Sequence, residues 1–262
     1  MPRSLFFCFV LSALFTLQAT AQDRPILYHA GFHALVSSSE TQPFWLTANR
    51  NGVVRPDQAS GFLRLNAHLP LRDHRRFDYG LGADLTGYPV GARHLYIGQL
   101  YARVKYGPVQ LYGGRQTENH GVHDETLSSG SLGWSTNALP MPKIGIALPQ
   151  WTPLPFSRNF LHVKGHIAHG WFEPNRQTTS PWLHEKTIYG RIGGESLLNV
   201  YGGIMHYTVW AGDSPQYGPL PNQLKDFWSV LLATGGDEDA PPGEQDYMLG
   251  DHLGAWDFGF FL

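Results

Sequence analysis

The feature that most constrains this chain is an alternation of apolar and polar residues with a period of two. From Leu63 to Leu71 every odd position is apolar, and the even positions are mainly polar. After His74-Arg75-Arg76 the alternation restarts and continues from Phe77 to Leu85. Successive residues of a strand point to opposite faces of a sheet. The two segments therefore predict a hairpin whose strands each have one apolar and one polar face.

The same pattern predicts strands along much of the remaining chain. It recurs from Tyr96 to Tyr106 and from Val109 to Gly114, with a turn at Gly107-Pro108. We expect roughly ten strands in all, each close to the length of about 9–11 residues that crosses a membrane when tilted. The other segments expected to form strands are Phe160–Phe172, His184–Gly194, Leu197–Trp210 and Tyr247–Leu262.

Two segments depart from the strand pattern. A polar Gly/Ser-rich stretch between Glu118 and Pro142 predicts a long loop. Apolar residues at helical spacing from Leu224 to Leu232 predict one short amphipathic helix, with Gly235 as the residue that follows its end. The sequence has no repeat beyond the hairpin period and no linker, which favours a single domain.

Composition favours a sheet that is partly solvated by lipid. Only 15% of residues are charged, against about 25% in typical soluble domains, while 13% are aromatic. A soluble sandwich is still compatible with alternation alone, because its polar face would lie in water instead of lining a barrel. The net charge of -2 lacks the basic excess of a nucleic-acid binder, so we expect no nucleic-acid partner.

The N-terminus predicts export. Arg3 precedes an apolar stretch, Leu5–Leu17, and Ala19-Thr20-Ala21 matches a signal-peptidase site. We therefore expect a signal peptide over residues 1–21 and one outer-membrane β-barrel domain over residues 22–262. The only cysteine, Cys8, lies in the signal peptide, so the mature chain has no thiol for disulfides, catalysis or metal binding. No mature segment is apolar for the ~18 residues that a spanning helix needs, so a membrane crossing would require a closed barrel.

Several specific sequence blocks occur in order along most of the mature chain. The blocks are Pro43-Phe44-Trp45-Leu46, Asn49-Arg50-Asn51-Gly52, Asn137-Ala138-Leu139-Pro140-Met141-Pro142-Lys143-Ile144, His166-Ile167-Ala168-His169-Gly170-Trp171-Phe172, His184-Glu185-Lys186, Tyr189-Gly190-Arg191, Tyr201-Gly202-Gly203-Ile204-Met205-His206, Trp210-Ala211-Gly212 and Gly250-Asp251-His252-Leu253-Gly254-Ala255-Trp256-Asp257-Phe258. Together these blocks resemble the capsule assembly Wzi family, in particular its Bacteroidetes-type branch.

The resemblance implies an all-β, antiparallel transmembrane β-barrel with long extracellular loops that acts as a surface lectin. Proteins of this family help to attach and organise capsular polysaccharide outside the cell. Family members are considerably longer than this chain, which stops at Leu262 shortly after the Asp251 block. We therefore expect a C-terminally truncated, partial barrel.

Signals for metal binding and catalysis are weak. His162, His166 and His169 lie on one predicted strand, but strand geometry places His169 on the face opposite the other two. Asp78 and Asp84 share a face at a separation of about 20 Å, which exceeds the ~10 Å limit for glycosidase carboxylates. We expect no metal, no cofactor and no enzymatic activity, although carboxylates from different strands could still converge for glycan hydrolysis.

Polysaccharide binding requires aromatic faces for stacking and planar polar groups for sugar hydroxyls. The candidates cluster mainly where a predicted strand enters the long loop: Arg115, Glu118, Asn119, His120, Trp134, Trp151 and Trp210. The alternative role for each tryptophan is the interfacial aromatic girdle of a membrane barrel. The favoured function is an outer-membrane lectin. The alternatives are a porin-like channel and a glycan-acting outer-membrane enzyme, and a lectin differs from a porin in having its lumen filled.

Overall fold

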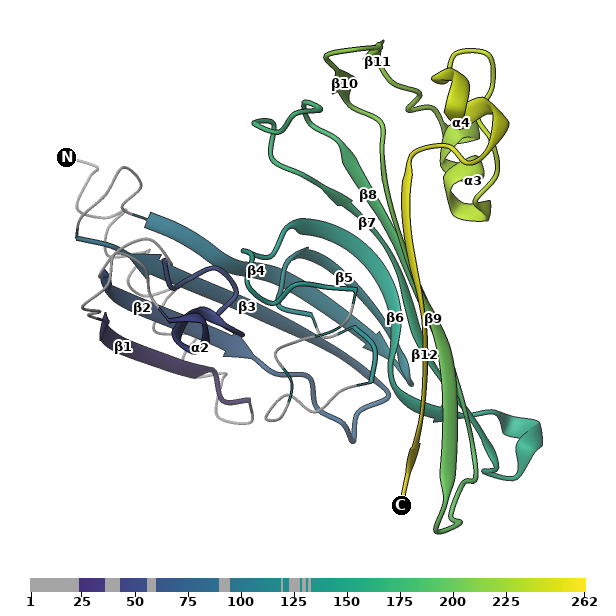
Figure 1. Ribbon diagram of the computed structural model, residues 1–262. Coiled ribbons are helices and arrows are strands. Elements are labelled where there is room, and N and C mark those ends of the chain that lie inside the picture. The colour runs from purple at the N-terminus through teal and green to yellow at the C-terminus, as the bar shows by residue number, and fades with distance from the viewer. Residues whose placement is uncertain are drawn as a thin grey trace, which may run out of the picture.

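The computed structural model describes residues 24–35, 43–55, 60–89, 95–118, 120–122, 128, 131 and 133–262. The expected signal peptide lies outside these residues. One antiparallel sheet of ten strands dominates the fold, and neighbouring strands follow one another along the chain (Figure 1). The strands are β1 (Leu27–Leu35), β2 (Ser60–Leu69), β3 (Phe77–Gly87), β4 (Leu95–Tyr106), β5 (Val109–Arg115), β6 (Pro142–Pro153), β7 (Leu161–Trp171), β8 (Trp182–Ile192), β9 (Asn199–Trp210) and β12 (Asp251–Phe261).

The all-β prediction is confirmed, but the sheet is open. Within the described residues β1 and β12 are its two edges and do not pair with each other. The alternating segments became strands close to their predicted bounds, whereas β1 and β6 were not predicted. β6 contains Pro149, which lacks the N–H of a sheet ladder. The ladder to β7 accommodates this proline with a register shift between Leu148 and Thr152.

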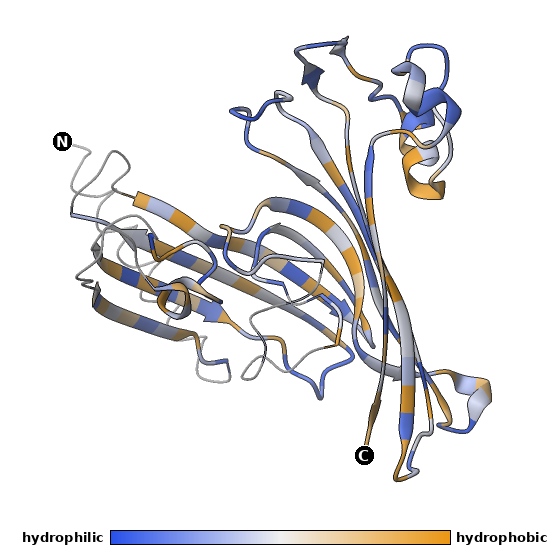
Figure 2. Ribbon diagram, in the orientation of Figure 1, coloured by the Kyte–Doolittle hydropathy of each residue, from blue (hydrophilic) through white to orange (hydrophobic). Residues whose placement is uncertain are grey.

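The faces of the sheet are inverted relative to those of a soluble protein. Along β3 the apolar odd positions are mostly exposed and the even positions are buried. Leu65 and Leu81 are 45% and 50% exposed, whereas Asp78 and Asp84 are 1% and 2% exposed. The alternation is visible as successive orange and blue bands along the strands in Figure 2. The prediction that Leu65 and Leu81 point away from the polar set is confirmed. We call the polar, covered side the inner face and the apolar, exposed side the outer face.

Tyrosine–glycine pairs hold neighbouring strands together on the inner face. In each pair a tyrosine lies directly opposite a glycine on a neighbouring strand, and a Cβ on that glycine would come within 2.6 Å of the tyrosine side chain. The aromatic ring thus fills the space that the glycine leaves. The pairs are Tyr101–Gly82, Tyr112–Gly145, Tyr189–Gly203 and Tyr201–Gly259.

Connections at the two ends of the sheet differ in length. Residues 70–76, 107–108, 154–160 and 193–198 form short connections at one end, and the last but one includes the 3-10 helix Pro155–Ser157. The other end carries the longer connections 36–59, 116–141 and 211–250, the first of which contains α2 (Phe44–Thr47). Outer-membrane barrels have short periplasmic turns and long extracellular loops. We call these the short-turn end and the long-loop end.

The connection between β9 and β12 folds onto the outer face at the long-loop end. It contains β10 (Asp213–Ser214), β11 (Gly218–Pro219), α3 (Leu224–Leu232) and α4 (Pro242–Asp246), and both helices lie beside the upper ends of β9 and β12 in Figure 1. Phe227 and Val230 of α3 pack against Trp210, in a cluster with Leu249.

The helix prediction needs two corrections. The described residues contain three short α-helices instead of one. α3 covers the predicted Leu224–Leu232, but its C-terminal cap is Ala233 in the left-handed conformation, with φ 55°, two residues before the predicted Gly235. None of the described helices is both long and apolar enough to span a membrane.

Candidate functional site

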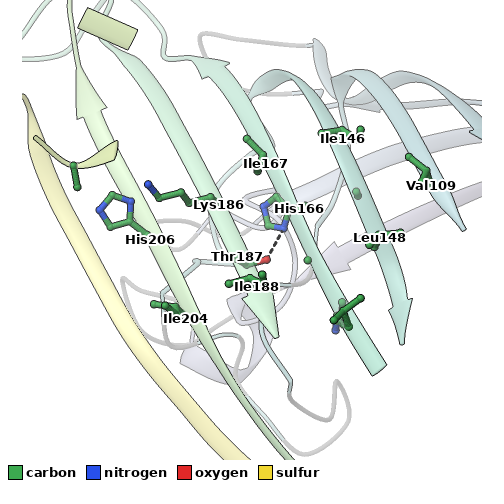
Figure 3. Close-up of a pocket in the computed structure, with 15 residues that line it drawn as sticks. Val109, Ile146, Leu148, His166, Ile167, Lys186, Thr187, Ile188, Ile204 and His206 are labelled. Carbon is green, nitrogen blue, oxygen red and sulfur yellow. Dashed lines mark hydrogen bonds between the residues drawn. The ribbon is translucent and has the colours of Figure 1, made fainter. Parts of the chain in front are cut away.

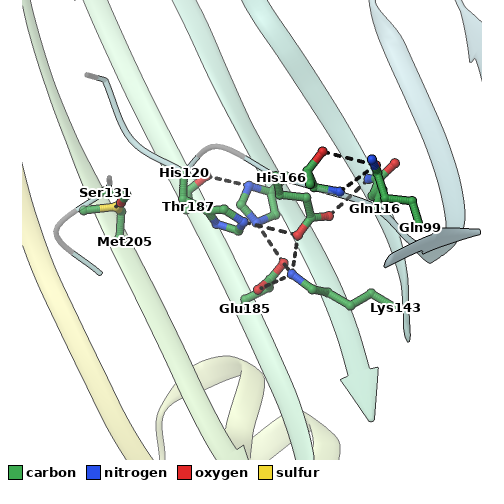
Figure 4. A network of polar contacts seen from close by, with 11 residues as sticks. Gln99, Gln116, His120, Ser131, Lys143, His166, Glu185, Thr187 and Met205 are labelled. Carbon is green, nitrogen blue, oxygen red and sulfur yellow. Dashed lines mark hydrogen bonds and ion pairs between the residues drawn. The ribbon is translucent and has the colours of Figure 1, made fainter. Parts of the chain in front are cut away.

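A charged cluster lies on the inner face where β6, β7 and β8 are adjacent. Lys143 of β6 and Glu185 of β8 are both fully buried, and the Lys143 Nζ lies 2.8 and 3.0 Å from the two Glu185 carboxylate oxygens. The same ammonium also donates to Glu118, from the loop that follows β5. Figure 4 shows this ammonium beside the Glu185 carboxylate. One cation therefore joins two strands and a loop.

Two histidines complete the cluster. His166 Nε2 lies 3.2 Å from Glu185 Oε1, and its Nδ1 lies 2.9 Å from the Thr187 hydroxyl. His120 Nε2 lies 3.2 Å from Glu118 Oε2. Burial lowers the pKa of His120 below its ordinary value, which favours the neutral ring. Burial opposes ionisation of Glu118, but the His120 hydrogen bond and the Lys143 charge outweigh it and lower the pKa of that carboxyl.

Trp134 holds the long loop against this cluster. Its ring stacks on His120 at a centroid distance of 4.7 Å, and the Lys143 Nζ lies 3.9 Å from the Trp134 ring centroid. Tyr207 of β9 also stacks on the Trp134 ring, at a centroid distance of 5.7 Å. Three of the residues predicted from the sequence, Glu118, His120 and Trp134, are therefore brought together. Their contacts fix the described part of the 116–141 loop to the inner face.

A polar groove extends from this cluster toward β2. One pocket of about 330 Å³ is lined by residues that include Gln116, Glu118 and His120. A second, of about 260 Å³, is lined by residues that include Arg64, Asp84, Gln99 and Tyr101. Both pockets share Arg103 and Thr117, so we treat them as one inner-face groove.

Arg103 is the central side chain of the inner-face groove. Its Nε donates to Gln116 Oε1 at 2.7 Å, and its guanidinium lies 4.5 Å from the centroid of the Tyr101 ring. Gln99 accepts hydrogen bonds from the Thr117 amide and hydroxyl at 3.0 and 3.1 Å. The groove thus offers a guanidinium, amides and an aromatic ring, the group types that orient a polar ligand.

The other predicted site residues lie elsewhere. Arg115 ends β5 and approaches Glu173 at 3.8 Å. Trp151 lies on β6 and packs edge-on against Tyr189 at 6.4 Å. Trp210 is only 3% exposed and lies on the outer face beneath α3, so it cannot line the same groove. This corrects the grouping of Trp210 with the loop residues. Asn119 lies outside the described residues.

The sequence did not identify Lys143, Glu185 and His166 of the buried cluster, or Arg103 of the inner-face groove, as site residues. Lys143, Glu185 and His166 occur at inward positions of three strands, and only the strand register brings them together. Arg103 was recognised as part of the polar strand face but not as a binding residue. An alternation pattern identifies a face but does not identify which side chains meet across it.

The cluster contains three side chains with the spacing of metal ligands. His120, His166 and Glu185 each offer a ligand atom, and these atoms all lie within 4.8 Å of one another. However, the Lys143 ammonium already supplies a cation to Glu185 and Glu118. The prediction that His169 lies on the face opposite His162 and His166 agrees with the structure. His166 contacts Glu185 on the inner face, and His162 has the same strand parity. His169 lies among Trp171, Trp182 and Trp210.

Glu118 and Glu185 differ from the carboxylate pair of a glycosidase. A glycosidase needs one carboxylic acid that is protonated and can donate to the leaving group. Glu118 and Glu185 instead share one ammonium, and an adjacent cation favours the ionised form of a carboxyl group.

Comparisons of the chain with protein-family models, with curated proteins and with solved structures find no match. A functional assignment therefore depends on the two faces of the sheet, the inner-face groove and the sequence blocks.

Proposed function

We propose that this chain forms part of an outer-membrane β-barrel that binds a capsular or other surface polysaccharide without cleaving it. The observation that carries the membrane location is the inverted sheet. Its exposed outer face bears large apolar side chains on strand after strand, whereas carboxylates, lysine and histidines are buried on the inner face. Lipid solvates such an outer face, and water does not.

The inner-face groove supports a polar, extended ligand. Sugars present many hydroxyls together with apolar ring faces, which Arg103, Gln99 and the Tyr101 ring complement. Two pockets that share residues match a chain of sugar units better than one isolated small molecule. Individual contacts of this kind are weak, and a repeating polymer that engages many protein copies gains affinity through avidity.

The sequence blocks shared with the capsule assembly Wzi family support the same assignment. Most of these blocks fall on β6 to β9 and β12, the strands next to the charged cluster and α3. We propose the family relationship on this basis.

A membrane-embedded form also requires closure. Backbone N–H and C=O groups at a sheet edge have no partner in hydrocarbon. Both β1 and β12 are edges of the described sheet. We therefore propose that further strand pairing at these edges completes the barrel in the membrane.

Co-sedimentation of the purified, membrane-reconstituted full chain with the host polysaccharide tests the proposal. Binding with unchanged polymer length supports it, and Arg103→Gln should weaken binding because glutamine cannot replace the charged fork of donors. Lys225→Gln is the matched control, since Lys225 is exposed on α3 and contacts Asp237. Progressive shortening of the polymer would indicate an enzyme. Solute flux into vesicles without polymer binding would indicate a channel.

A further inference from the structure

A second groove lies mainly on the outer face of the sheet. It borders the inner-face groove at β6, β7 and β8, where both are lined by Ala147, Leu148, Lys164, Gly165, His166 and Thr187. This outer-face groove has a volume of about 740 Å³. Each of four successive strands contributes one isoleucine to its wall, and all four are labelled in Figure 3: Ile146, Ile167, Ile188 and Ile204. The strand register places Ile146 opposite Ile167 and Ile188 opposite Ile204. The isoleucines therefore form two apolar pairs, one on β6 and β7 and one on β8 and β9, and Lys186 lies directly opposite Ile167.

Two basic side chains lie toward the long-loop end of this groove. Lys186 of β8 and His206 of β9 line the groove and are directly opposite each other in the strand register. Figure 3 shows both beside the isoleucines. The described residues that line the groove include no aspartate or glutamate. Lys164 also borders the groove, but its ammonium donates to the Gly121 carbonyl on the inner side at 3.0 Å.

Both Lys186 and His206 have a hydrogen-bonding atom that can still bind a ligand. Lys186 donates to the Leu231 carbonyl near the end of α3, and an ammonium has three donors. His206 contacts His252 through Nε2 at 3.0 Å, while its Nδ1 is buried without a hydrogen-bond partner. A ligand that brings an anionic oxygen to this position would satisfy both groups.

α3 carries a second apolar stripe that faces away from the sheet. Leu224, Trp228 and Leu232 follow at intervals of four residues, and all three are exposed. The opposite side of α3 is already buried against Trp210. A helix with an exposed apolar stripe of this kind lies in the membrane interface, and tryptophan is enriched at that level. Ala233, just after α3, lines the groove, so the C-terminal end of α3 adjoins it.

We propose that the outer-face groove binds a phosphorylated, acylated glycolipid of the outer leaflet. An acyl chain lies along the isoleucines, the phosphate contacts Lys186 and His206, and α3 lies at the level of the headgroups. This inference rests on the proposed outer-membrane location and on the assignment of the long-loop end to the cell exterior. It adds a lipid ligand that is distinct from the polysaccharide on the inner face.

The competing role for Lys186 is purely structural, because its ammonium also contacts a carbonyl near the C-terminus of α3. The two roles predict different behaviour. A structural role predicts the same lipid retention whether or not the lipid carries phosphate. A ligand-binding role predicts that retention depends on phosphate in the unaltered protein.

The test is native mass spectrometry of the full chain, purified from outer membranes in mild detergent. The unaltered protein should retain the phosphorylated glycolipid and prefer it over its enzymatically dephosphorylated form. Lys186→Met should reduce retention by about tenfold, the effect of losing one hydrogen bond to a charged group. Lys225→Met, which removes an exposed lysine of α3, should retain the lipid as the unaltered protein does. Heat-modifiable migration on gels verifies that each variant is folded.

Equal retention of the phosphorylated and dephosphorylated lipids by the unaltered protein would overturn the inference, even if Lys186→Met did not fold. Unchanged retention in folded Lys186→Met would also overturn it. Polysaccharide co-sedimentation of the same preparations separates the two proposals. Loss of lipid with polymer binding intact supports a separate lipid site, whereas lipid retention without polymer binding would overturn only the polysaccharide assignment.

Discussion

Removal of the Lys143 ammonium should destabilise the protein strongly, because this group compensates two carboxylates. Its Nζ lies 2.8 Å from Glu185 Oε1 and also contacts Glu118. Lys143 and Glu185 are fully buried and Glu118 is mostly buried. Loss of one partner from a buried ion pair costs about 3–5 kcal/mol, because the remaining charge is left uncompensated. We expect Lys143→Met to lower the free energy of unfolding by about this amount.

A double variant isolates the cause. Glu185→Gln added to Lys143→Met removes one uncompensated charge and should restore a large part of the lost free energy. Urea-induced unfolding in lipid vesicles, followed by tryptophan fluorescence, measures both changes, and Trp134 is a local probe because it stacks on His120. A loss below about 1 kcal/mol, the range of solvent-exposed pairs, would refute the reasoning. It would mean that water reaches the cluster.

Three further predictions follow from the faces and the loop. Leu65→Arg should reduce the free energy of folding into the membrane by about 2–4 kcal/mol if this position lies near the bilayer midplane, whereas Asn66→Arg, on the inner face, should reduce it far less. The folded yields of the two variants in lipid vesicles measure the difference, and equal yields would contradict the assignment of Leu65 to the outer face. Burial lowers the pKa of His120 below 6.5 in the folded protein, so the imidazole binds a proton more readily in the unfolded chain than in the folded one. The stability from this group should decline as pH falls below 6.5, and His120→Gln should flatten that part of the pH–stability curve; an unchanged curve would show that the ring is solvated. Gly203→Ala should lower the free energy of unfolding by about 1–3 kcal/mol, because the added methyl group would overpack against the Tyr189 ring. Gly190→Ala is the control, since a Cβ at Gly190 meets nothing within 4 Å. Equal unfolding midpoints for the two variants would contradict the Tyr189–Gly203 pairing.

The sequence predicted strands and their faces well where the alternation is local and regular. Leu65 and Asp84 lie on the expected faces because the side-chain direction of a strand depends only on position parity. β6 was missed because Pro149 interrupts its pattern, and a register shift accommodates that proline only in the assembled sheet.

The candidate site was predictable only in part. Glu118, His120 and Trp134 are close in sequence, so their common loop could be recognised. Lys143 and Glu185 are 42 residues apart, and their contact depends on the register of three strands. Trp210 lies on the outer face because it occupies an even position of β9. Its burial beneath α3 depends on how the connection 211–250 folds back onto the sheet, which the periodicity of the sequence does not encode.

Both proposed ligand sites depend on the register of β8. Glu185 points to the inner charged cluster and Lys186, the next residue, points to the outer-face groove. A slip of one residue would exchange the two faces of the strand, which would place the Glu185 carboxylate on the apolar outer face and remove the acceptor that pairs with Lys143. The pair Tyr189–Gly203 opposes this slip, because the tyrosine ring occupies space that only glycine leaves open. The same inner-face pair therefore maintains the polar groove on one side of β8 and the position of Lys186 in the outer-face groove on the other.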